Sequence, residues 1–206
     1  MRSTPDAKLD RSQGVWAVTH ARSVVDRVVE TGTKPPRPDS VDRVFQIERG
    51  AFVTLKKENQ LRGCIGRPTP DQPALQAIRV AAADAATNDP RFPPVSAQEL
   101  PSIRTEVSVL TPPEQLDSPH PETVTVGRDG LLVSGRGKSG LLLPQVPVDQ
   151  GWDAETFLAQ TCRKAGLPAD CWRDSAVSIE RFSAQIFEEQ TPKGVIVRRP
   201  IESAEE

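Results

Sequence analysis

The sequence predicts an α+β fold with mixed, mostly antiparallel sheets, flanking helices and two subdomains that share one core. Segments with helical periodicity and segments with strand periodicity occur together without a regular strand–helix alternation. Several short apolar runs are joined by brief polar connections, which is typical of hairpins. The 206 residues suffice for one sizeable core but not for two ordinary independent domains.

The first half of the chain contains two expected helices and one expected hairpin. Residues 13–30 carry valine and alanine at helical spacing, with Arg22 on the polar part of the wheel, and Gly32 ends the pattern. Residues 50–66 form two β runs around a polar turn. An alanine-rich helix follows over 71–89, and a proline-rich loop comes after it.

The second half is expected to be mainly β with one helix. Residues 103–110 alternate as a half-buried strand, with Ile103, Thr105, Val107 and Val109 on one side and Arg104, Glu106 and Ser108 on the other. Three short β runs at 122–127, 130–135 and 140–146 suggest a meander. A helix at 153–166 has an Asp N-cap and a closing glycine, and 176–189 resembles one long strand with a bulge near Arg181. The predicted domain spans 12–190 between polar termini, 1–11 and 191–206.

Composition excludes several classes of function. A net charge of −2 and no tyrosine argue against a nucleic-acid partner. No apolar stretch reaches membrane-spanning length, and the N-terminus lacks a signal-peptide pattern, so we expect a cytoplasmic protein with no membrane partner. Three cysteines and two distant histidines predict neither a disulfide framework nor a zinc site. Cys162 is expected in the core of its helix, and Cys171 beneath Trp172.

A glycine-rich hexapeptide at residues 135–140, GRGKSG, matches the G-x-G-x-x-G sequence pattern of dinucleotide-binding sites but lacks the structural context of that pattern. The fingerprint requires a following helix, whereas the next residues are β-like. We therefore expect a hairpin tip and no nucleotide, and the sequence gives no reason to expect any other cofactor.

The main candidate for a functional segment is LRGCIG at residues 61–66. In an extended strand Arg62 and Cys64 share one face, and a nearby guanidinium would favour a nucleophilic thiolate. Gly63 and Gly66 leave room for a ligand or a second backbone. The alternative is that Arg62 pairs with a carboxylate such as Glu106 while Cys64 only fills a small hole. The residues alone leave both interpretations open.

Several motifs, taken in order, give the chain a family resemblance. They are GAFVTL, LRGCIG, AADAATNDPRFPPV, EVSVLTPP, VGRDGLLV, GLLLPQV and GWDAETFLAQTCRKAGLP. Together they resemble the AMMECR domain family, also called AmmeMemoRadiSam system protein A, over residues 12–190. The resemblance implies an α+β fold of two subdomains. It also implies a pathway shared with two partners: a Memo-type protein and a radical S-adenosylmethionine enzyme.

The resemblance also marks residues that match the family's motifs. They are Arg62, Gly63, Cys64, Gly66, Asp89, Arg91, Phe92, Glu106, Ser108 and Gln145. Arg67 departs from the family pattern by adding positive charge, which favours an anionic ligand.

Two functional hypotheses follow. In the first, which we favour, the protein is a binding or accessory component with a cleft around LRGCIG, and its ligand-binding residues are Gly63, Gly66, Ser108, Gln145 and Arg91. In the second, the protein is an enzyme with three catalytic residues: Cys64 as nucleophile, Arg62 as its activator and Glu106 as acid or base.

Overall fold

The computed structural model describes residues 8–201 and has the predicted α+β fold. The chain divides into two compact units. Among the described residues, the first contains residues 8–110 together with Gln185–Arg199, and the second contains Thr111–Ala184 with Pro200 and Ile201. Each unit has its own hydrophobic cluster.

A five-stranded sheet forms the centre of the first unit, with strand order β2-β1-β3-β8-β9. The strands are β1 Ala51–Lys57, β2 Gln60–Arg67, β3 Ile103–Leu110, β8 Ala184–Glu189 and β9 Ile196–Arg199. The predicted hairpin is confirmed, because β1 pairs with β2, and β1 also pairs antiparallel with β3. Short 3₁₀ helices, η1 Arg43–Gln46 and η2 Ala97–Ser102, lie in the connections.

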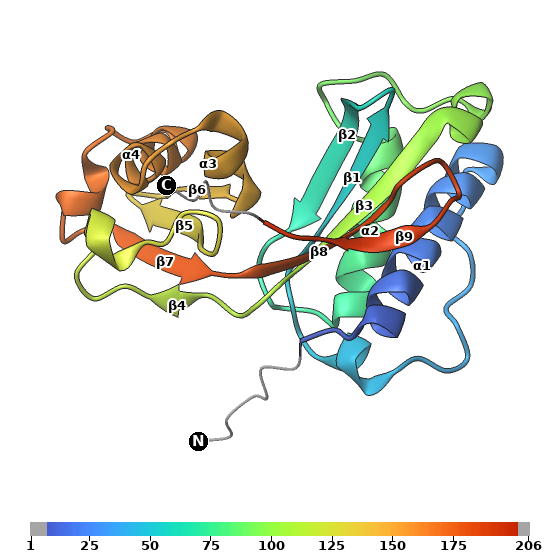
Figure 1. Ribbon diagram of the computed structural model, residues 1–206, viewed down its shortest axis with the longest axis horizontal. Coiled ribbons are helices and arrows are strands. Elements are labelled where there is room, and N and C mark those ends of the chain that lie inside the picture. Colours follow the sequence, from blue (N-terminus) through green and yellow to red (C-terminus); the bar gives the residue numbers. More distant parts are fainter. Residues whose placement is uncertain (1–7, 202–206) are drawn as a thin grey trace. The chain divides into compact units, whose positions relative to one another are not determined.

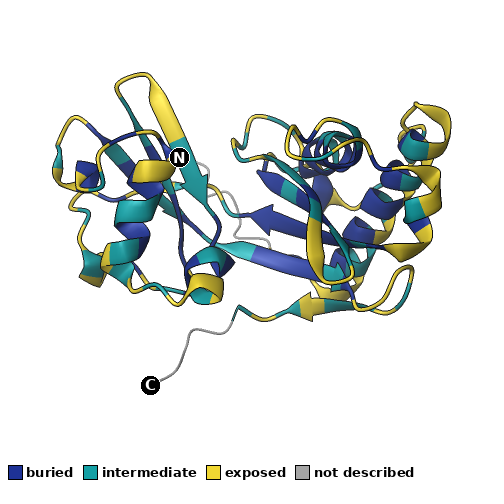
Figure 2. Cartoon of the chain, turned by 90° about the horizontal axis from the view of Figure 1, so that it is seen from above, coloured by how far each residue is buried: buried dark blue, intermediate teal, exposed yellow. Residues whose placement is uncertain are grey.

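Two long helices, α1 Arg11–Thr31 and α2 Ala74–Thr87, contact this sheet and each other (Figure 1). Asp10 caps α1 by accepting the Gln13 N–H, and the Gln13 side chain accepts the Asp10 N–H in return. Gly32 ends α1 in the left-handed conformation, as predicted. Burial of the alanines of α2 lets that helix approach β1 and β2 closely. Figure 2 colours the chain by burial and shows buried residues on both helices and strands.

Arg22 of α1 is buried, although it lies away from the apolar positions that predict the helix. Its guanidinium donates to the Ile103 and Leu100 carbonyl oxygens, each at 2.6 Å, and to Glu189 at 3.2 Å. Asp26 accepts the Nε–H at 2.9 Å. Helical periodicity marks Arg22 as polar but cannot show that buried acceptors surround it.

The second unit pairs a four-stranded sheet with two helices. The sheet order is β4-β7-β5-β6, and its strands are β4 Glu114–Gln115, β5 Gly130–Gly135, β6 Lys138–Leu142 and β7 Ser178–Phe182. The helices are α3 Gln145–Gln150 and α4 Ala154–Lys164, and two 3₁₀ turns are η3 Pro121–Thr123 and η4 Cys171–Arg173. Asp153 caps α4 as predicted, and the GRGKSG segment is a β5–β6 hairpin tip.

Three local predictions differ from the structure. Residues 122–127 form a 3₁₀ turn and a loop instead of a strand, because Asp129 accepts the Thr125 N–H and closes the loop. The predicted long strand over 176–189 is two strands, β7 and β8, which belong to different sheets and are separated at Ser183. The termini contribute more than expected: Leu9 is buried and β9 lies within 191–206.

Candidate functional site

In the first unit, the sheet face opposite the α1–α2 core carries four of the eight predicted site residues, namely Cys64, Gly66, Glu106 and Ser108. Core-facing positions on β1 are Ala51, Val53 and Leu55, so the intervening side chains point to the other face. The strand register aligns side chains of β2, β1 and β3 on this face in two rows. One row is Cys64–Thr54–Glu106 and the other is Gly66–Phe52–Ser108. We call this set of six residues the Cys64 face.

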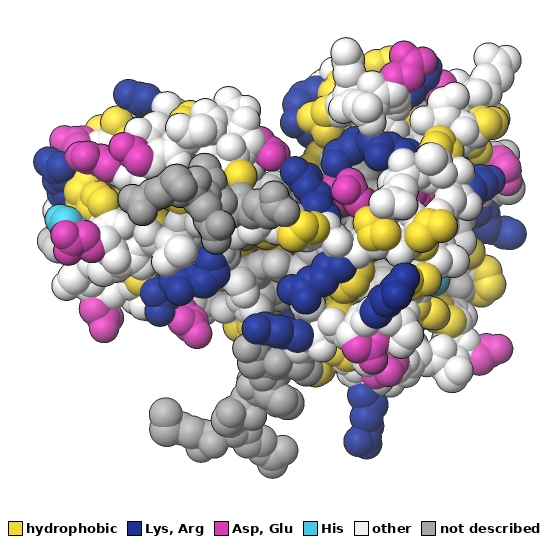
Figure 3. All heavy atoms as spheres, in the orientation of Figure 1, with side chains coloured by type: hydrophobic (Ala, Val, Ile, Leu, Met, Phe, Trp, Pro, Cys, Tyr) yellow, Lys and Arg dark blue, Asp and Glu magenta, His cyan; other side chains and the backbone are white. Residues whose placement is uncertain are grey.

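Glu106 on this face is held by two cations. Lys56 donates to Glu106 Oε2 at 2.7 Å, and Arg199 lies 3.4 Å from the same oxygen. Lys56 also reaches Glu188 at 3.3 Å. Figure 3 shows basic and acidic side chains next to one another on the surface of this unit. The Glu106 side chain is only 4% exposed, so its charge is compensated by ion pairs rather than by water.

Cys64 is a half-buried free thiol. Burial raises the pKa of this thiol, which outweighs the opposing effects of the Thr54 hydroxyl and the positive charge of Arg91. Thr54 Oγ1 donates to the Cys64 sulfur at 3.4 Å. The charges of Glu106 and Asp89 raise the pKa further. A raised pKa keeps the sulfur protonated near neutral pH, where a thiol is a poor nucleophile.

The backbone of Cys64 is fixed at the edge of the sheet by the DPRF segment. The Cys64 N–H donates to Asp89 Oδ2 at 2.8 Å, and the Arg91 guanidinium donates to the Cys64 carbonyl oxygen at 2.9 Å. Arg91 also donates to both carboxylate oxygens of Asp89. These bonds hold the pKa of Asp89 well below its usual value. Asp89 and Arg91 thus form hydrogen bonds with the backbone N–H and carbonyl groups of Cys64, which would otherwise be unpaired at the edge of the sheet.

Arg62 does not have either partner expected from the sequence. Its guanidinium binds Glu99 through two hydrogen bonds of 3.0 Å each and also donates to the carbonyl oxygens of Pro93 and Pro94. The Arg62 hydrogen bonds lower the pKa of Glu99 to about 2, aided by the Ser96 N–H. The alternative that Arg62 pairs with a carboxylate is confirmed, but that carboxylate is Glu99 and not Glu106. The cation whose charge lowers the pKa of Cys64 is Arg91 instead.

A β-bulge explains the position of Arg62. Leu55 pairs with Gly63, whereas the next residue, Lys56, pairs with Leu61, so Arg62 is the extra residue on β2. Strict alternation between Arg62 and Cys64 does not hold across such an irregularity. Arg62 therefore binds the proline-rich loop and η2.

The two glycines of the segment have different packing roles. Gly63 faces the helices, where a Cβ would collide with the carbonyl oxygen of Ala85. Gly66 lies on the Cys64 face, where a Cβ would collide with the Phe52 ring. Both positions therefore need glycine for close packing within the unit.

Ser108 is the most unusual member of the face. It is 1% exposed, and its hydroxyl has no hydrogen-bond partner within residues 8–201. A buried hydroxyl without a partner is uncommon and costs free energy. Thr105 lies on the opposite face of β3, inside the core that the helices cover, and its buried hydroxyl also has no hydrogen-bond partner among the described residues.

Two further predicted residues lie apart from this arrangement. Gln145 belongs to the second unit, where it begins α3 and is buried with its side-chain oxygen unpaired among the described residues. Arg67, expected to attract an anion, pairs with Asp84 at 3.2 Å.

Sequence reasoning missed the contributions of Thr54, Lys56, Glu99 and Arg199. Strand alternation could have indicated Thr54 and Lys56, since both share the face of Phe52. Glu99 and Arg199 lie far from LRGCIG in sequence, and no local pattern marks them.

Neither a metal cluster nor a membrane-spanning helix is found in the part of the chain that the structure describes. No group of three or more His, Cys, Asp or Glu side chains there is arranged to hold a metal ion. None of the helices in residues 8–201 combines the length and the apolar character needed to cross a bilayer.

The chain is similar to archaeal proteins over nearly its whole length. It is 46% identical over 202 residues to Protein PH0010 of Pyrococcus horikoshii, covering 94% of this chain and 98% of the relative. Protein MJ0810 of Methanocaldococcus jannaschii is also 46% identical, over 199 residues, with 94% and 98% coverage. The crystal structure of uncharacterised protein PH0010 superimposes with a TM-score of 0.90 and covers 94% of this chain and 100% of the other.

Agreement with a family description extends across both units. Residues 18–187 match the AMMECR1 family. This range contains β1, β2 and the Cys64 face as well as α4 and β7. Together with relatives at nearly half identity over almost the full length, this match shows that the chain belongs to the AMMECR1 family.

Proposed function

We propose that this protein is a cytoplasmic binding component and that the Cys64 face is its binding site. The observation that carries the proposal is the buried Ser108 hydroxyl, which has no partner among residues 8–201. A bound molecule that displaces the groups covering this hydroxyl can supply the missing hydrogen bond, so Ser108 contributes to binding without a competing bond to break.

The other contacts of the face support binding more than catalysis. The Cys64 thiol has a raised pKa, and Glu106 already forms ion pairs with Lys56 and Arg199. Arg62 holds Glu99 instead of activating the thiol. A nucleophile needs a lowered pKa or an adjacent free base, and these contacts supply neither to Cys64.

The proposed partners are a Memo-type protein and a radical S-adenosylmethionine enzyme, as the family resemblance implies. Next to the Cys64 face, Lys56 pairs with Glu106 and Glu188, and Arg199 pairs with Glu106, so positive and negative groups are balanced. Such a balanced surface suits a polar protein partner with charges of both signs, and we place an anionic ligand second to it.

Ser108→Ala tests the proposal, with Thr105→Val as its matched control. Each change removes a buried, unpaired hydroxyl from β3, one on the Cys64 face and one in the core. Both variants should unfold at the same temperature as the wild type or higher, because neither loses a hydrogen bond. Calorimetric titration with the purified Memo-type protein of the same genome should show binding weakened about tenfold or more by Ser108→Ala only, which corresponds to loss of one hydrogen bond.

Two results would contradict the proposal. The first is equal affinity of the wild type, Ser108→Ala and Thr105→Val for the Memo-type protein, or no binding by the wild type. The second is a clear loss of stability in Ser108→Ala, since that result would show that the hydroxyl already has a partner in the free protein.

A further inference from the structure

The second unit contains a disulfide that the sequence did not predict. Cys162, on the inner side of α4, bonds to Cys171 at the start of η4, nine residues away along the chain. Both sulfur-bearing residues belong to the hydrophobic cluster of this unit. The predictions of burial for both residues are confirmed, but the expectation that the cysteines form no disulfide was wrong.

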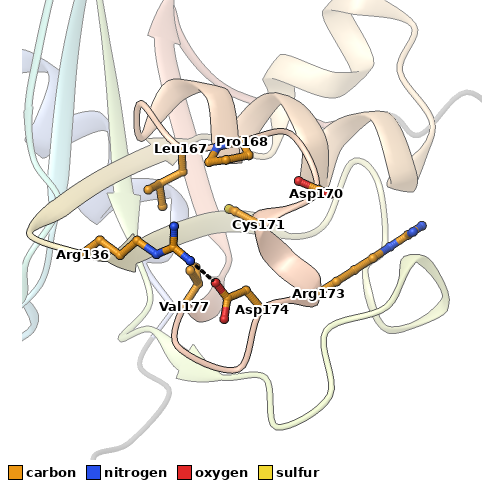
Figure 4. A pocket seen from close by; sticks show the side chains of 8 residues that line it. All are labelled: Arg136, Leu167, Pro168, Asp170, Cys171, Arg173, Asp174 and Val177. Atoms are coloured by element: carbon orange, nitrogen blue, oxygen red, sulfur yellow. Dashed lines mark hydrogen bonds and ion pairs between the residues drawn. The ribbon is translucent and has the colours of Figure 1, made fainter.

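The two halves of this disulfide have different surroundings. Cys162 is completely buried, whereas Cys171, although only 5% exposed, is one of the residues that line a pocket of about 270 Å³. Figure 4 shows Cys171 near Leu167 and Val177, with the Arg136 side chain directed at Asp174, to which it donates at 2.6 Å. The walls next to Cys171 are therefore apolar, and a charged pair lies at the side. Cys162 is not among the residues that line this pocket.

This asymmetry determines how a thiol can react with the disulfide. Exchange requires the attacking thiolate to reach one of the two sulfurs, and its rate depends on access and on which sulfur is attacked. Both cysteines belong to the hydrophobic cluster, but only Cys171 is among the residues that line the pocket, so the pocket gives access from the side of Cys171. A pocket of this size admits a small molecule but not a folded protein carrying a redox-active dithiol.

We infer that Cys171 is a site of reversible S-thiolation by a low-molecular-weight thiol that enters this pocket. The thiolate of the small molecule attacks Cys171 Sγ and forms a mixed disulfide. The Cys162–Cys171 bond breaks, and its electron pair leaves on Cys162 Sγ, which takes up one proton, equivalent to the proton that the small thiol lost when it ionised. The small thiol is oxidised and Cys162 is reduced, so atoms and electrons balance. Attack of Cys162 on the mixed disulfide reverses the reaction.

The charged side chains that line the pocket are of both signs: Arg136, Arg173, Asp170 and Asp174. Arg136 is exposed at the pocket wall, and its ion pair with Asp174 offsets its charge. Arg173 is directed away from the other lining side chains in Figure 4 and stacks on Trp172. Since Asp170 and Asp174 balance the two arginines, the pocket selects a small thiol by its size and not by its charge.

Backbone hydrogen bonds around the disulfide do not depend on the sulfur–sulfur bond. The Leu167 N–H donates to the Cys162 carbonyl oxygen, and the Cys171 N–H donates to the Pro168 carbonyl oxygen, each at 3.0 Å. These bonds keep the loop between α4 and η4 in place while Cys171 is modified. The reaction is accordingly expected in the folded protein.

Peptide mapping of the native protein after treatment with reduced glutathione tests this inference. The full-length protein is incubated at mildly alkaline pH, then denatured and trapped with iodoacetamide. We expect glutathione on Cys171 and the alkyl group on Cys162. Glutathione mainly on Cys162, or no adduct before the protein is denatured, would overturn the inference.

Pro168 supplies a variant that closes the pocket without changing either cysteine. Pro168 is an exposed lining residue, so Pro168→Trp places an indole over the entrance, whereas Pro168→Ala leaves it open. We expect Pro168→Trp to slow the reaction with glutathione about tenfold or more and Pro168→Ala to leave the rate within about twofold of wild type. Equal rates in the two variants would contradict access through the pocket.

A measurement on the wild type alone avoids any folding defect of the variants. A thiol attached to a large soluble polymer should react with the protein about tenfold more slowly than glutathione, after correction for the rates of both thiols with an exposed reference disulfide. Equal corrected rates would also overturn the inference.

Discussion

Replacing Arg22 with alanine is expected to lower the free energy of unfolding by about 3–5 kcal/mol. Arg22 and Glu189 are both nearly fully buried, and burial already raises the pKa of Glu189 despite the nearby guanidinium. Without Arg22, the Glu189 carboxylate loses its buried counter-ion, and the carbonyl oxygens of Ile103 and Leu100 lose their donor. The cost of an uncompensated buried charge is therefore added to that of two lost hydrogen bonds.

Arg27→Ala is the matched control, since Arg27 is exposed on the same helix. It should change the free energy of unfolding by no more than about 0.5 kcal/mol. Urea denaturation of the two variants and the wild type measures both values. A loss for Arg22→Ala as small as that of Arg27→Ala would show that the buried ion pair does not stabilise the first unit.

The second large effect is expected from Asp89→Asn, with a loss of about 2–3 kcal/mol at pH 7. Asp89 is 4% exposed and accepts hydrogen bonds from the Cys64 N–H and from Arg91. The amide keeps the shape of the carboxyl group but loses its charge and one acceptor oxygen. Asp84→Asn is the control, because its pairing with Arg67 lies in a more exposed setting and should contribute about 1 kcal/mol or less.

The pH dependence of this loss follows from the lowered pKa of Asp89. A carboxyl group whose pKa is lower in the folded state stabilises the protein above its unfolded pKa, which is about 3.9, and this contribution is lost as the pH falls through the folded value. The difference in stability between the wild type and Asp89→Asn should hold from pH 7 to about pH 4 and shrink in more acid solution. A difference that stays constant down to pH 2 would show that the Asp89 charge is not responsible.

Sequence periodicity predicted the fold class well because most elements are amphipathic. The α1 helix, the β1–β2 hairpin and α4 all combine a periodic apolar face with turn or cap residues that act locally. Residues 122–127 were predicted as a strand because alternation alone cannot reveal the contact of Asp129 with the Thr125 N–H.

The candidate site could be predicted only where alternation is regular. On β3, strand alternation correctly placed Glu106 and Ser108 on one face. On β2, the bulge at Arg62 interrupts the alternation, so the prediction that Arg62 and Cys64 share a face does not hold. The disulfide was missed for a different reason: an odd number of cysteines indicates no pairing, and only the fold brings the η4 turn against α4.

Titration of Cys64 reactivity tests most directly whether the LRGCIG segment binds rather than catalyses. Cys162 and Cys171 are bonded to each other, so iodoacetamide added to the native, unreduced protein reports on Cys64. We expect alkylation at pH 7 to be slower than that of a small free thiol, with a midpoint above the ordinary cysteine pKa, because burial raises the pKa of this thiol. Alkylation faster than that of the free thiol, with a midpoint below its pKa, would contradict the proposed function and identify Cys64 as an activated nucleophile.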